Sequence, residues 1–412
     1  MPKSMPGLDK IKRALVKTDW YSKIDPKKVV IVAGTNGKGT TSAALESLLL
    51  HAGQRVGFYS SPHLVSTTER IRLNGIDIAE ADFLNVFHRC EALIKECELS
   101  HFEALTLMAG EYFFGALNTA PLDFAILEVG LGGTYDATNA FPHKYVVVTK
   151  LGLDHVSILG STIQDIAVNK FGVVTNKSIV VHHVLPVEVA ELKARVQKQT
   201  NSNWVETEKA ELIIDDQGSR PRYFLKHADL AMKFEINIPG ARAAENVMTA
   251  ATMFQILGFD LSHHVEALKQ IQWAGRMQEV KIPAINCPVY LSGDHNLQGI
   301  QSLIEILKNY RFKRLHLVVG IGVDKQADEM FQLLSQLPQV VFYLTRTPFK
   351  GRALNEYPEW VRQKAEGQSE NVSEILNAVA QNANAEDLCV VTGSLYLVGE
   401  VLKTMPKLST PI

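Results

Sequence analysis

The chain has 412 residues, of which 46% are hydrophobic and 21% are charged, and its formal net charge is −2. This length predicts two or three domains with sizeable cores, and this charge balance excludes a broadly basic surface, so no nucleic-acid partner is expected. The sequence has no signal-peptide pattern, no run of roughly 18 apolar residues and no Cys-x-x-Cys pair, so we expect a cytoplasmic chain without a membrane span, a disulfide framework or a zinc site.

The first predicted element is a buried strand, Val29 to Ala33, which leads through a glycine-rich turn into a helix from Thr40 to His51. The glycines of this turn allow backbone N–H groups to point inward, Lys38 supplies a cation, and the helix N-terminus attracts an anion. The pattern predicts a site for a nucleoside triphosphate with magnesium, in a variant form because Gly39 separates the lysine from the threonine. The structural alternative is a glycine-rich turn before an ordinary helix.

Three further apolar runs, Phe124 to Val129, Tyr145 to Thr149 and Ile179 to Val181, predict buried strands of a parallel, helix-covered sheet. Ligands of such sheets lie beyond the carboxyl ends of the strands. Glu128 stands at one such end and is predicted to bind magnesium. The alternative is a buried structural carboxylate that pairs with a basic group. His155 follows the next strand and is a candidate for contact with a metal or an acyl phosphate, although a lone histidine is more often a structural hydrogen bonder.

The polar stretch from Asn201 to Arg222 predicts an exposed hairpin. A second series of strands follows Pro283, at Val289 to Leu291, Leu315 to Val319, Val340 to Leu344 and Leu388 to Val391. We therefore predict an α/β protein. Residues 1–280 are expected to form a phosphate-loop NTPase-like domain with a parallel sheet, and residues 281–412 a smaller, Rossmann-like α/β domain.

Short motifs follow one another along almost the whole chain. They are the phosphate loop, Ser61-Pro-His-Leu64, Glu69-Arg-Ile-Arg72, Glu128-Val-Gly-Leu-Gly-Gly133, Asp136-Ala-Thr-Asn139, Gly152-Leu-Asp-His155, Pro239-Gly240, Asn246, Trp273-Ala-Gly-Arg276, His295-Asn296, Asp324-Lys325 and Thr392-Gly-Ser-Leu-Tyr-Leu-Val-Gly399. This series resembles the folylpolyglutamate synthase and dihydrofolate synthase family of the Mur ligase superfamily. The resemblance implies an ATP-dependent acid–amino-acid ligase that joins L-glutamate to a pteroate or folate carboxylate through an acyl phosphate.

The resemblance also implies roles for single residues. Those that hold ATP are Gly34, Thr35, Asn36, Gly37, Lys38, Gly39, Thr40, Asn246 and Arg276. The implied Mg²⁺ ligands are Ser61, Glu128 and His155, the implied catalytic residues are Lys38, His155, Lys170 and His295, and the implied substrate-binding residues are Asp294 and Ser394. Lys170 matches the family lysine that reacts with carbon dioxide to give a carbamate.

Several of these residues also have an ordinary structural explanation. From the sequence alone, Lys170 would be a solvated helix lysine. Asn246 would be an amide on a helix face, and Arg276 a salt-bridge partner at a domain junction. Ser394 would be the N-cap of a helix from Leu395 to Lys403.

Several positions depart from the family pattern. Thr134 stands where an arginine is usual, and Ser292-Gly-Asp294 stands where Asp-Gly-Ala is usual before His295. Two further hypotheses therefore stay open beside the folate ligase: a Mur-type amide ligase for a different carboxylate or amino acid, and a nucleotide-binding paralogue that has lost ligation. Because the whole site is expected from one chain, a monomer would be sufficient for activity.

Overall fold

The computed structural model describes residues 7–118, 120–217, 220–227, 232–271 and 273–405. Contacts divide the chain into two compact units. Unit 1 consists of Met1–Glu211, Leu225–Glu235 and Arg242–Ile271, and unit 2 consists of Leu212–Phe224, Ile236–Ala241 and Gln272–Ile412. Each unit contains a sheet rich in parallel strands with helices between them, so the predicted α/β class is confirmed. The predicted domain boundary after residue 280 stays a prediction.

Unit 1 is built on an eight-stranded sheet in the order β4-β3-β2-β5-β1-β6-β7-β8. The strands are β1 (Val29–Ala33), β2 (Val56–Tyr59), β3 (Ile71–Leu73), β4 (Ile76–Asp77), β5 (Phe124–Glu128), β6 (Tyr145–Val148), β7 (Ile179–His182) and β8 (Asn203–Glu206). Strands β2, β5, β1, β6, β7 and β8 run parallel, so the predicted parallel sheet is confirmed. The apolar runs predict β1, β5, β6 and β7, but not β2 or β8. An antiparallel edge of β3 and β4 was not predicted; these strands join through Asn74-Gly75, both with positive φ, as a tight hairpin turn requires.

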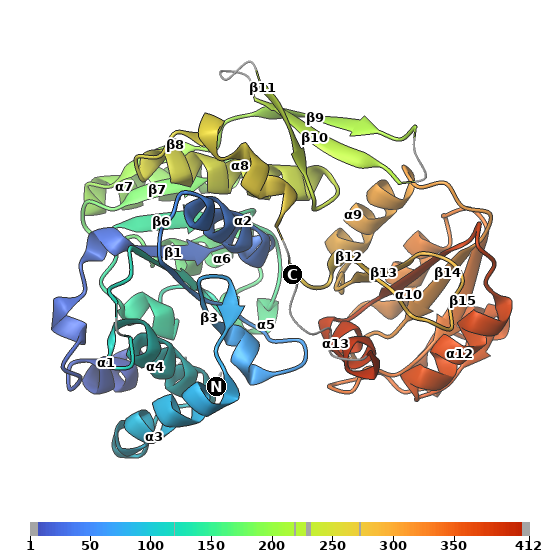
Figure 1. Ribbon diagram of the computed structural model, residues 1–412, viewed down its shortest axis with the longest axis horizontal. Coiled ribbons are helices and arrows are strands. Elements are labelled where there is room, and N and C mark those ends of the chain that lie inside the picture. Colours follow the sequence, from blue (N-terminus) through green and yellow to red (C-terminus); the bar gives the residue numbers. More distant parts are fainter. Residues whose placement is uncertain (1–6, 119, 218–219, 228–231, 272, 406–412) are drawn as a thin grey trace. The chain divides into compact units, whose positions relative to one another are not determined.

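Helices cover both faces of this sheet (Figure 1). They are α1 (Asp9–Leu15), α2 (Lys38–His51), α3 (Glu80–Glu96), α4 (His101–Phe114), α5 (Val156–Leu159), α6 (Ile163–Phe171), α7 (Ala190–Thr200) and α8 (Ala241–Ile256). Helices α1, α3 and α4 lie on one side, and α2 and α8 lie on the other. All five residues of β1 are buried, which explains why this strand is a continuous apolar run in the sequence.

The predicted hairpin between Asn201 and Arg222 is only partly correct. A three-stranded sheet, ordered β11-β10-β9, is formed by β9 (Ala210–Asp215), β10 (Arg222–His227) and β11 (Met232–Ile236), so the second part of that stretch does enter a hairpin. The first part instead forms β8, which pairs in parallel with β7. Within β8, the ring centroid of Trp204 lies 5.0 Å from that of Phe171, so this strand has an apolar contact that the polar composition around it does not suggest.

Unit 2 contains a six-stranded sheet in the order β12-β13-β17-β14-β15-β16. The strands are β12 (Arg276–Val280), β13 (Val289–Ser292), β14 (Leu315–Val319), β15 (Val340–Leu344), β16 (Gly367–Gln368) and β17 (Leu388–Thr392). The helices are α9 (Leu297–Leu307), α10 (Ala327–Leu334), α11 (Glu359–Lys364), α12 (Val372–Asn382) and α13 (Leu395–Thr404). Because β13, β17, β14 and β15 run parallel, the residues that follow them emerge at one edge of the sheet.

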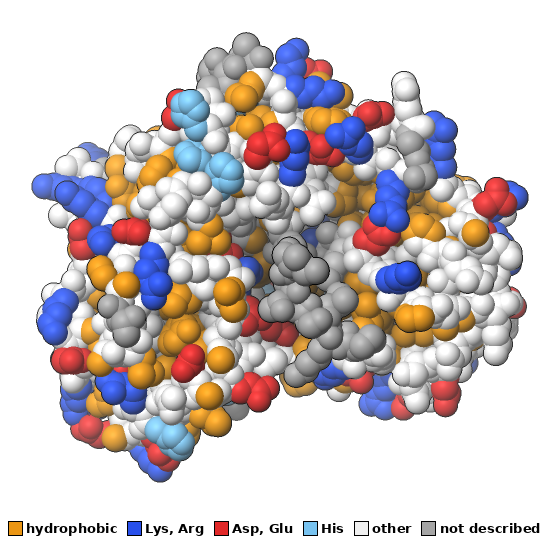
Figure 2. Space-filling view, in the orientation of Figure 1, with side chains coloured by type: hydrophobic (Ala, Val, Ile, Leu, Met, Phe, Trp, Pro, Cys, Tyr) orange, Lys and Arg blue, Asp and Glu red, His pale blue; other side chains and the backbone are white. Residues whose placement is uncertain are grey.

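The surface charges, the cysteines and the helix lengths can be compared with the expectations from composition. On the face drawn in Figure 2, acidic and basic side chains are interspersed, as the net charge of −2 leads one to expect. The four cysteines are buried free thiols. Within the described residues, none of the helices is both long enough and apolar enough for a membrane crossing.

Candidate active site

The predicted phosphate loop lies between β1 and α2, at the carboxyl end of a central strand. Gly34 and Gly37 have φ values of 148° and 94°, which L side chains rarely adopt. An added Cβ would overlap Thr149 at Gly34 and Asn246 at Gly37. Helix α2 begins at Lys38, so its first turn contains Gly39 and Thr40, where helix N–H groups have no intrahelical partner. The backbone N–H groups in the first turn of α2 can therefore donate hydrogen bonds to a ligand bound at this loop.

The end of β6 holds the main chain of this loop. The carbonyl of Lys150 accepts hydrogen bonds from the N–H groups of Thr35 and Asn36 at 3.0 and 3.4 Å. Thr149 Oγ1 donates to the Asn36 carbonyl at 2.8 Å. Thr35 Oγ1 donates to the Gly152 carbonyl at 2.9 Å and accepts from the Gly152 N–H at 3.1 Å. The loop is thus fixed by the strand next to β1, independently of any ligand.

Lys38 and Lys170 meet at the carbonyl of Gly34, to which their Nζ atoms donate at 3.1 and 2.8 Å. Lys170 lies near the end of α6 and is only 4% exposed, so the solvated helix lysine is the wrong reading. Burial first, and the nearby Lys38 cation second, lower the pKa of Lys170 from 10.5 to about 7. A substantial fraction of the Lys170 amine is therefore neutral near neutral pH.

Glu128 ends β5 and is 4% exposed. Its Oε2 accepts a long hydrogen bond of 3.5 Å from the N–H of Ser61, so two of the three predicted metal ligands are neighbours. The third, His155, is exposed and lies beside Asp154, with 3.9 Å between Nε2 and Oδ2. Across the described residues, no three His, Cys, Asp or Glu side chains form a group that could hold a metal ion. The predicted ligand set, which combines two such side chains with a serine, stays a prediction.

The other predicted nucleotide residue of unit 1 lies against the loop. Asn246 belongs to α8, is 7% exposed and packs beside Gly37. Its neighbour Glu245 lies 3.7 Å from the Nζ of Lys150, the residue whose carbonyl holds the loop. The structure therefore brings Asn246, the glycine-rich turn, Lys38 and Lys170 together in one unit.

Three residues support this site through contacts that were not predicted from the sequence. Thr149 holds the loop as described above. Asp136 accepts hydrogen bonds from the N–H groups of Gly130 and Leu131, both at 3.0 Å, and so shapes the turn after β5. Thr134, at the position where an arginine is usual, binds the Asn169 carbonyl through its N–H at 2.8 Å and its hydroxyl at 3.0 Å. The available signal was a small polar residue directly after a strand or a glycine-rich turn.

A Gly37→Ala variant tests whether the phosphate loop requires a residue without a side chain at this position. We expect it to lower the free energy of unfolding by about 1–3 kcal/mol and to weaken nucleotide binding, because its Cβ would have a strained φ and overlap Asn246. Urea denaturation and titration with a fluorescent ATP analogue measure these effects. Gly53→Ala is the control, since Gly53 also has a positive φ, of 76°, but open space around its Cβ position. Equal losses in both variants would contradict the packing argument.

In unit 2, the segment after β13 carries Asp294 and His295. Ser292 Oγ donates to Asp294 Oδ2 at 2.5 Å. The serine, which stands where the family pattern has an aspartate, therefore holds the carboxylate two residues later. The His295 Nδ1 lies 2.8 Å from the carbonyl of Gly293. The carbonyl of Asp294 accepts a hydrogen bond from the Gly393 N–H at 3.0 Å, which ties this segment to the end of β17.

Ser394 directly follows Gly393, after the end of β17. Its hydroxyl accepts from the Tyr396 N–H at 3.1 Å, so its predicted role as the N-cap of the following helix is confirmed. The same hydroxyl lies 3.2 Å from Thr347 Oγ1, which follows β15. Arg276 begins β12 opposite Ser292. Asp294, His295 and Ser394 thus gather at one edge of the sheet in unit 2.

Comparisons with known proteins define the class of enzyme. Residues 32–254 match the family model of the Mur ligase middle domain, and residues 275–395 match that of the Mur ligase glutamate ligase domain. The first match alone spans more than half of the chain. The protein is therefore an ATP-dependent ligase of the Mur type.

Individual relatives narrow this class. The dihydrofolate synthase/folylpolyglutamate synthase of Escherichia coli is 30% identical over 383 residues, which cover 92% of this chain and 86% of that protein. A folylpolyglutamate synthase structure from Mycobacterium tuberculosis shares the fold, with a TM-score of 0.82, 23% identity and coverage of 97% and 95% of the two chains. A bifunctional folylpolyglutamate synthase/dihydrofolate synthase with Mn, AMPPNP and L-glutamate bound has a TM-score of 0.80, 27% identity and coverage of 98% and 95%. The chain belongs to the folylpolyglutamate synthase/dihydrofolate synthase family.

Proposed function

We propose that this protein uses ATP and Mg²⁺ to ligate L-glutamate to the carboxylate of a pteroate or folate. The observation that carries the proposal is the phosphate loop, where Lys38 and the buried Lys170 share the Gly34 carbonyl. A related structure with Mn, AMPPNP and L-glutamate bound supports the same classes of ligand here. All the proposed residues come from one chain, so we also propose a monomer, located in the cytoplasm.

The residues of the loop fit a triphosphate and its metal. The positions of Gly34 and Gly37 leave no room for side chains, and the buried hydroxyls of Thr41 and Ser42 in the same helix turn have no hydrogen-bond partner among the described residues. Ser61 and Glu128 offer oxygen ligands, the type that Mg²⁺ prefers, and His155 offers a nitrogen. These three residues would hold Mg²⁺, which when bound would offset the negative charge of the phosphates.

The chemistry follows from these charges. A carboxylate is a poor electrophile, so we propose that it attacks the γ-phosphorus of ATP, forming a C–O–P link as the bond to ADP breaks. The glutamate amine then forms the C–N bond, phosphate leaves, and the amine gives up a proton. Lys38 donates hydrogen bonds to the transferring group, where fixed donors are most effective. Arg276 would contact the phosphates, and Asp294, His295 and Ser394 would orient the amino acid.

We further propose that Lys170 is carbamylated. Its Nζ would form a bond to the carbon of carbon dioxide as one C–O π bond opens and Nζ loses a proton. This reaction requires the neutral amine, and about half of the Lys170 side chains are neutral at pH 7 when the pKa is about 7. The resulting negative group beside Lys38 would be suited to bind a second metal ion.

The test is ATP-dependent product formation by the purified protein with Mg²⁺, L-glutamate and either dihydropteroate or tetrahydrofolate. We expect phosphate release that needs both substrates, and a product heavier by one glutamyl group with at least one pterin. The pterin that reacts identifies the synthase activity. Nucleotide binding without product from either pterin would reject the folate assignment and favour a different substrate or a lost ligation activity.

A further inference from the structure

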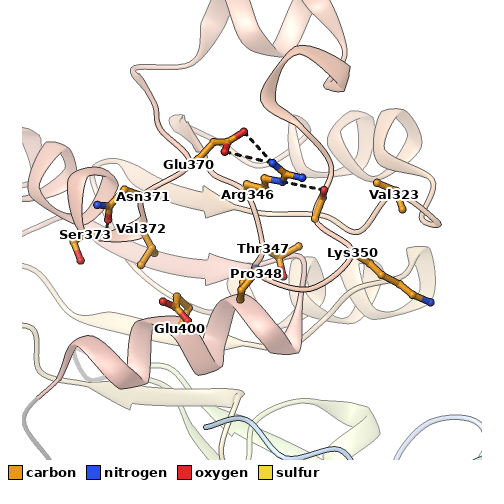
Figure 3. Close-up of a pocket in the computed structure, with 11 residues that line it drawn as sticks. Val323, Arg346, Thr347, Pro348, Lys350, Glu370, Asn371, Val372, Ser373 and Glu400 are labelled. Carbon is orange, nitrogen blue, oxygen red and sulfur yellow. Dashed lines mark hydrogen bonds and ion pairs between the residues drawn. The ribbon is translucent and has the colours of Figure 1, made fainter.

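A pocket of about 740 Å³ opens in unit 2 at the carboxyl ends of β15 and β16, between the start of α12 and α13 (Figure 3). Its wall combines two cations, Arg346 and Lys350, with two carboxylates, Glu370 and Glu400. None of these four residues is part of the site described above. A mixed wall of this kind suits a small ligand that carries both signs of charge.

Arg346 is held in this pocket by contacts that use only some of its hydrogen-bond donors. Its Nη1 lies 3.4 Å from both carboxylate oxygens of Glu370, and its Nε donates to the Gly351 carbonyl at 3.3 Å (Figure 3). Its Nη2 makes no hydrogen bond or ion pair with any residue that the structure describes. The two contacts therefore fix the plane of the guanidinium while the edge containing Nη2 keeps donors for a ligand.

The pocket adjoins the proposed amino-acid site through one residue. Arg346 directly precedes Thr347, and consecutive Cα atoms are about 3.8 Å apart. Thr347 Oγ1 in turn lies 3.2 Å from Ser394 Oγ. Thr347 itself lines the pocket, so the pocket that holds Arg346 and the hydroxyl of Ser394 share this residue.

We propose that Arg346 binds the side-chain carboxylate of the amino acid that this enzyme ligates, and that it selects glutamate over the neutral glutamine. This inference rests on the proposed function, because it concerns the same amino-acid site. The planar fork of a guanidinium binds a carboxylate through two N–H groups, whereas the amide of glutamine offers it one oxygen and no charge. Glu370 acts as a positioning residue, since it contacts Arg346 and not the substrate. Lys350 adds a second cation to the pocket.

The experiment compares Arg346→Ala with a matched control, Arg311→Ala. Arg311 is exposed and precedes β14, at the opposite end of the strands. Arg346→Ala should raise the KM for glutamate by roughly tenfold to a hundredfold, leave the KM for ATP within twofold and narrow the preference for glutamate over glutamine by a similar factor. Arg346→Lys keeps the positive charge but not the planar guanidinium, so its KM for glutamate should lie between those of the wild type and Arg346→Ala. Arg311→Ala should match the wild type. A KM for glutamate that stays within twofold in Arg346→Ala would overturn the proposal.

Direct binding separates this inference from the proposed function. Isothermal titration of L-glutamate into the wild type and Arg346→Ala, both loaded with magnesium and AMPPNP, does not require turnover. Weaker binding in the variant supports the role of Arg346 even if no pterin is glutamylated, and equal binding rejects it even if ligation is observed. Because the Arg346–Glu370 pair is about half exposed, its loss should leave the melting temperature nearly unchanged, and a large drop would instead assign Arg346 a structural role.

Discussion

A Lys38→Ala variant is expected to lose roughly a hundredfold to a thousandfold in kcat for ATP-dependent ligation, the range found when one preorganised donor to a transition state is removed. Lys38 is the cation of the phosphate loop, and its Nζ is held at the carbonyls of Gly34 and Thr35, at 3.1 and 3.4 Å. Charge moves onto the transferring phosphoryl group as the reaction proceeds, so the loss should be larger in kcat than in the KM for ATP. Steady-state phosphate release at saturating glutamate and pterin measures both constants.

The control is Lys198→Ala, which removes an exposed lysine from α7 in the same unit. It should retain wild-type constants. A Lys38→Ala variant that keeps its kcat while its KM for ATP rises would show that Lys38 only binds the ground state, and would contradict its assignment to the transferring group.

Replacing Lys170 with alanine is expected to reduce ligation by at least roughly a hundredfold, because it removes the buried amine that would carry the carbamate. The pH dependence of the wild type provides a second readout. Below the pKa of about 7 the amine is protonated and cannot react with carbon dioxide, whereas above it the amine is neutral. Wild-type activity should therefore fall as the pH decreases through about 7, and added bicarbonate should partly restore it, while Lys170→Ala should not respond to bicarbonate.

Carbon-13 bicarbonate gives a direct measurement, since a carbamate carbon yields its own NMR resonance in the wild type that must be missing from Lys170→Ala. Lys198→Ala again serves as the control and should keep the resonance. If the wild type shows neither the resonance nor a response to bicarbonate, Lys170 acts as an unmodified amine beside the loop. The deep burial of Lys170 also requires a check of folding, for which circular dichroism of the variant is sufficient.

Much of the fold could be predicted because buried parallel strands leave continuous apolar runs. The strands β1, β14 and β15 have the bounds expected from the sequence, and the helix after Ser394 ends within one residue of its expected end. Short edge strands such as β3 and β4 leave no such run, since they depend on a turn and on partners far along the chain. The strand β8 was missed for a related reason, because it is short and polar at both ends and depends on its pairing with β7 and on the contact of Trp204 with Phe171.

The candidate site shows the same division. The glycine-rich loop is a local pattern, so the sequence alone was enough to expect a phosphate site there. The burial of Lys170 and its contact with Gly34 join residues 136 positions apart, and no spacing rule reveals such a pair. The support from Thr134 and Thr149 is equally hidden, since both act through backbone carbonyls of distant segments. Arg346 lacked any motif, and only the pocket draws attention to it.

The hydrogen bond between Ser292 and Asp294 couples two positions at which this segment differs from the family pattern. Where the family pattern has Asp-Gly-Ala, this chain has Ser-Gly-Asp, and the serine hydroxyl donates to the carboxylate at 2.5 Å. Either single substitution would be unfavourable: an aspartate at 292 would place two like charges side by side, and an alanine at 294 would remove the carboxylate altogether. The side chains at 292 and 294 therefore depend on each other, and the free-energy effects of substitutions at the two positions are expected to be non-additive.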